Sequence, residues 1–233
     1  MQNLSRLELI TNEETIRKIK EKNILLIGLG GVGGYAFETL VRSGIENITI
    51  VDGDTFEESN LNRQVLSLVS TINKNKTDVA ESRAKEINPN VKIKKITKIL
   101  TKENIYEINF NEYDYVIDAC DTMEIKKELI KITTRNNIKF ISSMGTGNKF
   151  HPELLEITTL DKTEYDPIAK ILRKYVKEEK INKKIKVVAS KEKPIKTNSK
   201  TIGSNAFVPG VAGMLLTSYV INDIVGEVWK YMI

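Results

Sequence analysis

Short apolar runs and longer amphipathic segments alternate along the first 150 residues, with glycine, asparagine or acidic residues between them. Such apolar runs are typical of strands buried in a parallel sheet, so we predict strands near residues 24–28, 47–51, 91–96, 115–119 and 138–142. The intervening segments predict helices near residues 12–22, 32–43, 76–88, 101–108 and 123–136. This alternation predicts an α/β fold: a Rossmann-like, mainly parallel sheet with helices on both faces.

The pattern changes after residue 150. Residues 155–158 and 186–188 predict two more strands, and we expect the sheet to be extended by antiparallel strands toward the C-terminus. A basic helix is predicted between them, at about residues 166–178. Residues 191–206 are rich in Lys, Ser, Asn and Thr, which predicts a mobile loop.

The run from Phe207 to Val225 is apolar enough to raise the question of a membrane span. Its uninterrupted apolar part is shorter than the roughly 20 residues that a spanning helix needs. We therefore predict a buried helix that begins at Pro209, packs closely through Gly210 and Gly213, and does not insert stably into a membrane.

The length of 233 residues suits one sizeable domain. We predict a single domain over residues 1–233, with a first part at about 20–150 that holds the alternating strands and helices and an extension at about 151–233 that carries the basic segment. The start lacks the charged and apolar regions of a signal peptide. The single cysteine, Cys120, excludes an internal disulfide and suits a reducing cytoplasm, so we expect a cytoplasmic protein.

The scarcity of Cys and His also excludes several kinds of chemistry. One cysteine cannot form the paired Cys-x-x-Cys motifs of a structural zinc site, and we interpret Cys120 as a small buried side chain rather than a nucleophile. One histidine, His151, leaves no Ser-His-Asp, Cys-His or histidine-rich metal site, and it is predicted to lie in a loop. Catalysis, if any, is therefore expected from carboxylate, Lys and Arg groups.

Charge is spread unevenly along the chain. Residues 170–200 hold twelve Lys or Arg and three Glu, a local net charge of +9, whereas the whole chain carries +5 and the remainder therefore −4. Such a run is most often a solvated helix face, and composition alone slightly favours that interpretation. The alternative is contact with the phosphate backbone of RNA.

A glycine-rich turn, Gly28-Leu29-Gly30-Gly31-Val32-Gly33-Gly34, follows the first predicted strand. Its glycines allow a sharp turn and a close approach of the backbone to a phosphate, and a helix that opens near Val32 would direct its N-terminal N–H groups toward that phosphate. Asp52 and Asp54 follow the second strand, where a carboxylate can hold ribose hydroxyls. Alone, these features are only a general nucleotide-binding pattern.

A second group of polar residues separates the possible chemistries. The segment Ser59-Asn60-Leu61-Asn62-Arg63-Gln64 comes shortly after the acidic pair, and Lys76 begins the next predicted helix. Asp121 and Thr122 follow the strand at 115–119, and ligands of open α/β sheets bind at such carboxyl ends. A dehydrogenase has no use for these Asn, Arg and Lys residues, whereas attack on an α-phosphate builds negative charge that an Arg can stabilise.

These residues resemble the motifs of the ubiquitin-activating-enzyme superfamily in both order and spacing. Within it, the chain looks like the bacterial tRNA threonylcarbamoyladenosine dehydratases. The segments that carry this closer resemblance are 5–10, 165–170, 188–192 and 203–209. Sulfur-carrier relatives have Asp-Asn where this chain has Asp121-Thr122.

The resemblance implies an ATP- and magnesium-dependent adenylation of the threonyl carboxylate of threonylcarbamoyladenosine next to the tRNA anticodon, followed by ring closure with net dehydration. It implies catalytic roles for Arg63, Asp121 and Arg6, with Asp121 at the magnesium ion and Arg6 reaching into the phosphate site of the partner in a homodimer. The residues expected to bind ATP are Gly28, Gly30, Gly31, Gly33, Asp52, Asp54, Ser59, Asn60, Arg63, Lys76, Asp121 and Thr122.

The resemblance also favours RNA as the partner of the basic segment, with Lys183, Lys184 and Lys186 as predicted tRNA contacts and no role for DNA. It leaves open whether a cysteine desulfurase acts as a relay partner. Two other enzymatic functions stay open at this point, beside a third class, a nucleotide-sensing or scaffold protein that has lost catalysis. They are an adenylyltransferase that activates the C-terminal glycine of a small sulfur-carrier or ubiquitin-like protein, and an NAD-dependent oxidoreductase. The missing zinc cysteines count against the first, and the unused Asn60, Arg63 and Lys76 against the second.

Overall fold

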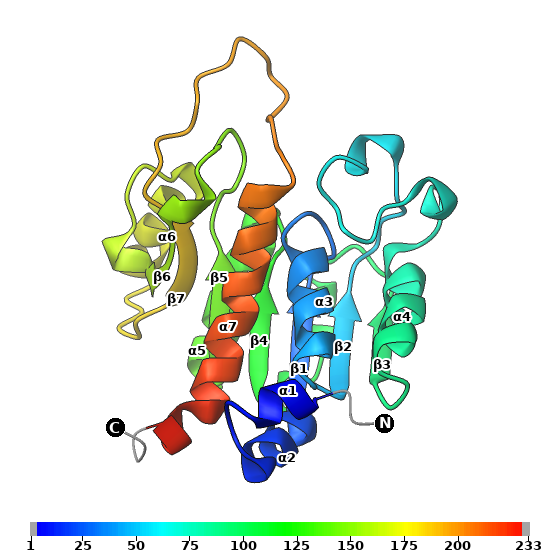
Figure 1. The fold of residues 1–233 in the computed structure, drawn as a ribbon. Helices are drawn as coiled ribbons and strands as arrows, with labels where there is room; N and C mark the ends of the chain where they lie inside the picture. The colour runs from blue at the N-terminus through cyan, green and yellow to red at the C-terminus, as the bar shows by residue number, and fades with distance from the viewer. Residues whose placement is uncertain (1–3, 230–233) are drawn as a thin grey trace.

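Seven strands form one sheet in the computed structural model, which describes residues 4–229 (Figure 1). In sequence they are β1 (Asn23–Ile27), β2 (Asn47–Val51), β3 (Lys92–Ile96), β4 (Tyr115–Asp118), β5 (Lys139–Ser143), β6 (Leu155–Thr159) and β7 (Lys186–Ser190). Their spatial order is β3-β2-β1-β4-β5-β7-β6, and each neighbouring pair is parallel except β7 and β6. The predicted parallel sheet and its C-terminal extension are confirmed, with the antiparallel direction confined to β6.

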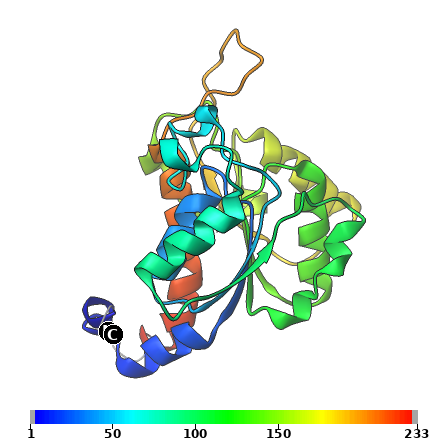
Figure 2. The same ribbon diagram turned by 90° about the vertical axis from the view of Figure 1, so that its right-hand side faces the viewer.

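Helices cover both faces of this sheet (Figures 1 and 2). One face carries α3 (Gly33–Arg42), α4 (Lys76–Ile87) and α7 (Phe207–Trp229), and the other carries α5 (Met123–Arg135) and α6 (Pro167–Glu178). The short helices α1 (Ser5–Glu8) and α2 (Glu13–Glu21) lie at the end of the sheet where its parallel strands begin. Successive residues of β1 point to opposite faces of the sheet and so contribute to two hydrophobic cores. Ile24 and Leu26 belong to one core, and Leu25 and Ile27 belong to the other.

The last helix, α7, packs closely against α3, as its glycines predict. A Cβ at Gly213 would lie 2.3 Å from the carbonyl oxygen of Val32, so only glycine allows this approach. Thr217 Oγ1 donates to the carbonyl oxygen of Ala36 at 2.9 Å. The stretch Phe207–Gly226 has the length and hydropathy of a membrane span, but 56% of it is buried in the fold and its apolar side forms part of the core.

Two predicted elements differ from the structure. The helix expected at residues 101–108 is only a 3₁₀ helix at Asn104–Glu107, because Asn104 binds the backbone of Thr101 and Ile99 with its side chain and so competes with helical hydrogen bonds. The last helix begins at Phe207 rather than Pro209, since proline is tolerated throughout the first helical turn. The helix predicted near residues 12–22 is confirmed as α2, and Asn12 caps it, since its Oδ1 accepts from the N–H of Thr15.

Candidate active site

A cleft of about 1120 Å³ opens at the carboxyl ends of the parallel strands. It lies where the strand order reverses, since β1 leads to β2 and β3 on one side and β4 leads to β5 on the other. This is the position at which open α/β sheets bind ligands. Eleven of the twelve predicted ATP-binding residues line the cleft; Gly33 does not.

The glycine turn between β1 and α3 forms the floor of the cleft. Gly28 has a φ of +92°, which favours glycine, and a Cβ there would lie 2.7 Å from the carbonyl oxygen of Ala119. Gly33 begins α3, and a Cβ on it would lie 1.8 Å from the carbonyl oxygen of Gly28. Gly33 therefore shapes the turn from behind, while the N-terminus of α3 faces the cleft as predicted.

The carboxylate of Asp52 joins the ends of β1 and β2. It accepts hydrogen bonds from the N–H of Leu29 at 2.7 Å and from the N–H of Asp54 at 2.9 Å. Burial raises the pKa of Asp52, and the ammonium of Lys76, 4.0 Å away, partly opposes this. Lys76 is buried at the first turn of α4 and lies 3.0 Å from Asp54. The carboxylates of Asp52 and Asp54 thus hold the Lys76 ammonium beside the position expected for phosphates.

The segment after β2 presents Arg63 to the cleft. Arg63 Nη1 donates to the carbonyl oxygen of Ser59 at 2.7 Å and to Asn62 Oδ1 at 3.0 Å. Asn60 is buried, and its Oδ1 accepts from the N–H of Glu57, so it closes the turn that carries Ser59. Arg63 is thus held in place by neutral groups, and no carboxylate of residues 4–226 forms a salt bridge with it.

Asp121 and Thr122 lie at the carboxyl end of β4, as the sequence predicts. Both are exposed, and the nearest polar contact of the Asp121 carboxylate is Thr122 Oγ1 at 3.5 Å, so its oxygens are available to a ligand. Residues 4–229 contain no group of three or more His, Cys, Asp or Glu that could hold a metal by themselves. Magnesium in nucleotide sites is commonly bound by one or two carboxylates together with phosphates, which a lone Asp121 fits.

Cys120 is not activated as a nucleophile. Its thiol donates to Asp118 Oδ1 at 3.0 Å, and burial, followed by the charge of Asp118, raises its pKa well above the usual value. A thiol is reactive as thiolate, which this environment disfavours. His151 is exposed and pairs with Glu153 at 2.8 Å, in the loop position predicted for it.

A buried ion pair beneath the cleft was missed by the sequence analysis. Lys126 Nζ donates to Asp118 Oδ2 at 2.9 Å, to Ser142 Oγ at 3.3 Å and to the carbonyl oxygen of Ser143 at 2.8 Å. Burial alone would lower the pKa of Lys126, but the charge and hydrogen bond of Asp118 together with neighbouring Cys120 and Asp121 outweigh it, and the pKa is raised. The only sequence signal was an aspartate that ends an apolar strand, since a buried carboxylate needs a cation.

The far wall of the cleft holds a second buried pair that was also missed. Asp166 Oδ2 accepts from the N–H of Gly145 at 2.9 Å and lies 3.3 Å from Lys149 Nζ. Asn205 Nδ2 donates to the carbonyl oxygen of Lys149 at 2.8 Å. The segments 165–170 and 203–209, noted in the sequence without a task, therefore fix the turn that follows β5.

Four other candidates lie away from the cleft. Arg6 is exposed on α1, which lies beyond the C-terminal end of α3, because Leu4 packs against Gly44 there. The glycine turn is at the opposite end of α3, a ten-residue helix about 15 Å long. The three predicted RNA contacts are exposed near the start of β7, at the end of the sheet where the parallel strands begin (Figure 1); they are Lys183, Lys184 and Lys186.

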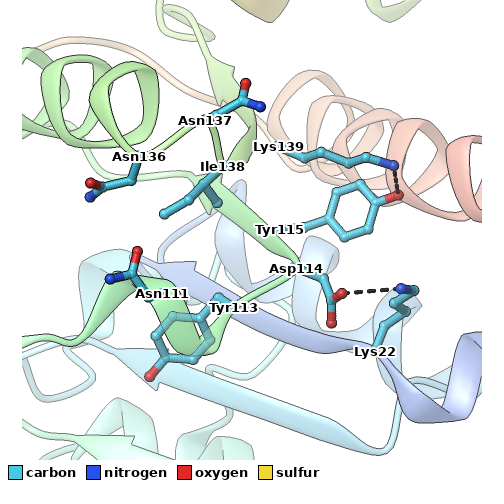
Figure 3. A pocket seen from close by; sticks show the side chains of 9 residues that line it. All are labelled: Lys22, Asn111, Tyr113, Asp114, Tyr115, Asn136, Asn137, Ile138 and Lys139. Atoms are coloured by element: carbon cyan, nitrogen blue, oxygen red, sulfur yellow. Dashed lines mark hydrogen bonds and ion pairs between the residues drawn. The ribbon is translucent and has the colours of Figure 1, made fainter.

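A smaller hollow of about 350 Å³ lies at that same far end, around the starts of β4 and β5 (Figure 3). Its cations are already paired: Lys22 lies 3.0 Å from Asp114, and Lys139 lies 2.6 Å from Asp223 and 3.1 Å from the Tyr115 hydroxyl. Because these contacts neutralise the two lysines of the hollow, the large cleft is the better match for an anionic nucleotide.

Comparisons with known proteins identify the family to which the chain is related. The model of the ThiF family matches residues 2–226. The tRNA threonylcarbamoyladenosine dehydratase of Bacillus subtilis is 36% identical over 241 residues, covering 96% of this chain and 95% of that protein. Alignments with the dehydratases of Haemophilus influenzae and Escherichia coli cover 64% and 62% of those proteins.

Solved structures give the same picture. The Escherichia coli tRNA N6-threonylcarbamoyladenosine dehydratase in complex with ATP matches with a TM-score of 0.91 at 28% identity, covering 98% of this chain and 96% of that chain. A structure of the same enzyme in complex with AMP matches equally well. The predicted fold class and family resemblance are thereby confirmed.

Proposed function

The chain belongs to the ThiF family, and from this membership and its cleft we propose that it is an ATP-dependent tRNA threonylcarbamoyladenosine dehydratase. It would adenylate the threonyl carboxylate of threonylcarbamoyladenosine next to the anticodon and then close it into a ring. The observation that carries this proposal is the meeting of Arg63, Lys76 and Asp121 around a glycine turn in one cleft. We further propose that residues 1–233 act as a single adenylate-forming domain.

The roles of the residues follow from their chemistry. The N–H groups of the glycine turn and the start of α3 face phosphates, and the Asp52 carboxylate is placed for ribose hydroxyls. Arg63 and Lys76 neutralise the phosphates. We propose that Asp121 holds magnesium together with phosphate oxygens, because its carboxylate is exposed to the cleft and free of salt bridges within residues 4–229. When bound, magnesium would neutralise charge on the leaving pyrophosphate.

The reaction then balances in two steps. A carboxylate oxygen of the substrate attacks the α-phosphorus of ATP, and pyrophosphate leaves with the bonding electrons. A nucleophile within the same modification attacks the acyl carbon, loses its proton and displaces AMP, which carries away one oxygen of the original carboxylate. The nucleoside therefore loses one water. Arg63 is positioned to stabilise the charge that grows on the α-phosphate.

We propose that the enzyme acts as a homodimer in which Arg6 reaches the partner's cleft. In its own subunit, Arg6 is separated from the glycine turn by the length of α3. The outer side of α7 exposes Phe207 and Met214, two turns apart, and Phe150 packs edge-on against Phe207 at 5.0 Å between ring centroids. Exposed apolar patches of this kind are typical of subunit interfaces.

The remaining expectations stay proposals of the same kind. We propose a cytoplasmic location, tRNA rather than DNA as the nucleic-acid partner, and no stable membrane insertion by α7. Lys183, Lys184 and Lys186 lie far from the cleft, so they would contact a part of the tRNA remote from the modified base. A cysteine desulfurase as relay partner is compatible with the proposal but has no dedicated residue in the described cleft.

The two alternatives are less well supported. An activator of a small carrier protein would be expected to have zinc-binding cysteine pairs and often a cysteine nucleophile, whereas the single Cys120 is half-buried and its thiol donates to Asp118. An oxidoreductase would leave Arg63, Lys76 and Asp121 without a task at the phosphate end of the cleft.

Mass spectrometry of tRNA nucleosides tests the proposal directly. We expect purified protein with ATP and magnesium to convert the threonylcarbamoyl nucleoside to a species one water lighter, and Asp121→Ala to abolish the conversion. The matched control is Asp161→Ala, which removes an exposed carboxylate outside the cleft and should leave the rate unchanged. A wild-type protein that binds ATP but leaves the nucleoside unchanged would overturn the proposal.

A further inference from the structure

The cleft is larger than a nucleotide alone requires. Its volume of about 1120 Å³ exceeds the roughly 300–1,000 Å³ of ordinary small-molecule pockets. The expected ATP residues line one half. The other half is lined by the turn after β5, the start of α6 and part of the segment 191–206, which rises above the carboxyl ends of the strands (Figures 1 and 2). This half is the place for the second substrate.

Hydrogen bonds between distant segments fix this far wall. Asn148 accepts from the N–H of Gly203 through Oδ1 at 2.7 Å, and its own N–H donates to the carbonyl oxygen of Gly203 at 2.8 Å. The N–H of Ile195 donates to the carbonyl oxygen of Asn148 at 2.7 Å. With the Lys149–Asp166 pair behind it, the wall is preorganised and does not depend on a ligand for these contacts.

One residue beside this wall takes no part in the packing of the fold. Tyr165 is 50% exposed, belongs to neither hydrophobic core, and its hydroxyl has no hydrogen-bond partner among residues 4–229. Its φ of +53° lies in the left-handed region, which an aromatic residue rarely adopts. The other non-glycine residues there are three Asn, which tolerate it, and Lys180, which ends α6.

The surroundings of Tyr165 explain how this backbone is held and where the ring stands. Asp166, the next residue, has both carboxylate oxygens engaged, with Oδ1 accepting from the N–H of Ala169 and Oδ2 from that of Gly145. Lys193 Nζ lies 4.8 Å from the centroid of the Tyr165 ring. Tyr165 and Lys193 do not themselves line the cleft, but the next residue of each, Asp166 and Pro194, does, so the ring and the ammonium lie beside its edge.

An exposed ring beside a cation at the mouth of a phosphate-binding cleft matches the chemistry of single-stranded RNA. Unpaired bases stack on aromatic side chains, and nearby lysines neutralise the backbone. Three more lysines are exposed on the segments that contribute to this wall: Lys170 on α6, and Lys196 and Lys200 within residues 191–206. No carboxylate within residues 4–229 forms a salt bridge with Lys193.

We propose that Tyr165 and Lys193 form a nucleobase subsite at the rim of the cleft. The Tyr165 ring stacks on an unpaired base of the anticodon loop at or beside the modified adenosine, and Lys193 neutralises an adjoining phosphate. The stack holds the base outside the cleft while the group attached to it extends inward toward the phosphates. This inference rests on the proposed function, since it assumes an RNA substrate.

Paired substitutions separate the ring from the backbone. Tyr165→Asn keeps a residue that tolerates the left-handed conformation but removes the ring, whereas Tyr165→Phe keeps the ring and removes only the hydroxyl. We expect Tyr165→Asn to weaken binding of the tRNA roughly 5- to 100-fold and to raise its KM, with Tyr165→Phe within about twofold of wild type. Lys193→Gln should reduce the salt dependence of binding, and Lys92→Gln, an exposed lysine at the start of β3, is its matched control.

A second readout does not depend on affinity. In an anticodon stem-loop carrying 2-aminopurine beside the modified position, we expect wild type and Tyr165→Phe to change the emission of the base on binding, and Tyr165→Asn to leave it unchanged at saturating protein. ATP titration and thermal melting check that each variant is folded.

Three outcomes would overturn the subsite. They are unchanged RNA binding and KM in Tyr165→Asn, equal losses in Tyr165→Phe and Tyr165→Asn, and a 2-aminopurine signal that does not depend on the ring. Failure of the proposed function would look different, because the wild-type protein itself would then leave tRNA unmodified. An active wild type with active Tyr165 variants rejects the subsite alone.

Discussion

At the scale of single residues, the buried charges beneath the cleft are the least replaceable groups. The side chains of Asp118 and Lys126 are almost completely buried, and the charge of each compensates that of the other. Asp118 Oδ1 also accepts from the N–H of Cys120 at 3.1 Å, so the pair supports the strand end that presents Asp121. A pair of this kind adds little net stability, but removing one partner leaves an uncompensated charge in the core.

We therefore expect Lys126→Met to lower the free energy of unfolding by about 3–5 kcal/mol. The double variant Asp118→Asn/Lys126→Met should recover a large part of that loss, because it removes the orphaned charge. Urea denaturation of the three proteins measures both effects. The control is Lys131→Met on the same helix, whose ammonium has no salt bridge in the described part of the chain. A single variant as stable as its control would show that Asp118 finds compensation elsewhere.

A substitution at Cys120 tests whether the reaction proceeds without a cysteine nucleophile. Because burial raises its pKa, we expect Cys120→Ala to modify tRNA at a rate within about twofold of wild type. The measurement is nucleoside mass spectrometry under conditions of limiting enzyme. Loss of turnover with unchanged ATP binding would instead indicate a thioester step and would favour the carrier-protein alternative.

At the scale of elements, the pattern of apolar residues predicts the buried strands and the regular helices. The strands were predicted to within one or two residues of their ends, because runs such as Ile24–Ile27 have to be buried on both faces of a parallel sheet. The helix expected at residues 101–108 fails because Asn104 binds the local backbone with its side chain, an effect that periodicity does not detect. The four-residue helix α1 is too short for any period to show.

The cleft also has one half that could be predicted from the sequence and one that could not. The phosphate half follows from local motifs, since its residues follow a predicted strand, begin a predicted helix or, like Asn60 and Arg63, belong to a short sequence motif between the two. The far wall depends on contacts across long sequence separations, such as Lys149 with Asp166 and Asn205. A lysine in an amphipathic helix, such as Lys126, also looks like a surface residue until its partner is known.

The docking of α7 gives a prediction at this scale. Asp223 near its end accepts from the Tyr115 hydroxyl and from Lys139 Nζ, each at 2.6 Å, and so ties the helix to β4 and β5. Burial raises the pKa of Asp223, but the bonds to Lys139 and Tyr115 outweigh it and the pKa is lowered. Because a lowered pKa means that the folded state favours the charged form, its contribution is present above the unfolded value of 3.8 and is lost as pH falls through the folded pKa.

We expect Asp223→Asn to lower the free energy of unfolding by about 1–2 kcal/mol at pH 7, a value reduced for partial exposure of the carboxylate. The difference from wild type should shrink as the pH falls below 3.8. Denaturant titrations of both proteins at several pH values measure it. If the difference in the free energy of unfolding does not depend on pH, the loss of stability comes from altered packing and not from the charge of Asp223.

At the scale of the whole molecule, the sheet separates two surfaces. The cleft, the glycine turn and the segment 191–206 lie at the carboxyl ends of the parallel strands, whereas α1, α2 and the basic residues before β7 lie at the opposite end (Figure 1). Arg6 therefore has no route to the cleft of its own subunit. A two-fold dimer can supply it, because a symmetric interface brings different surfaces of two copies together twice.

Mixed dimers test this arrangement. Arg6→Ala and Asp121→Ala are each expected to be nearly inactive. In a mixed dimer, the subunit with intact Asp121 receives Arg6 from the other subunit, so one site is complete and the other lacks both groups. Random exchange at equal concentrations makes about half of the dimers mixed, and the expected activity is about one quarter of wild type. Subunit exchange must be verified independently, for example by native mass spectrometry of differently tagged chains. If exchange is complete and activity does not rise above that of the separate variants, Arg6 does not act across a dimer interface, and its distance from its own glycine turn then leaves it no place in the reaction.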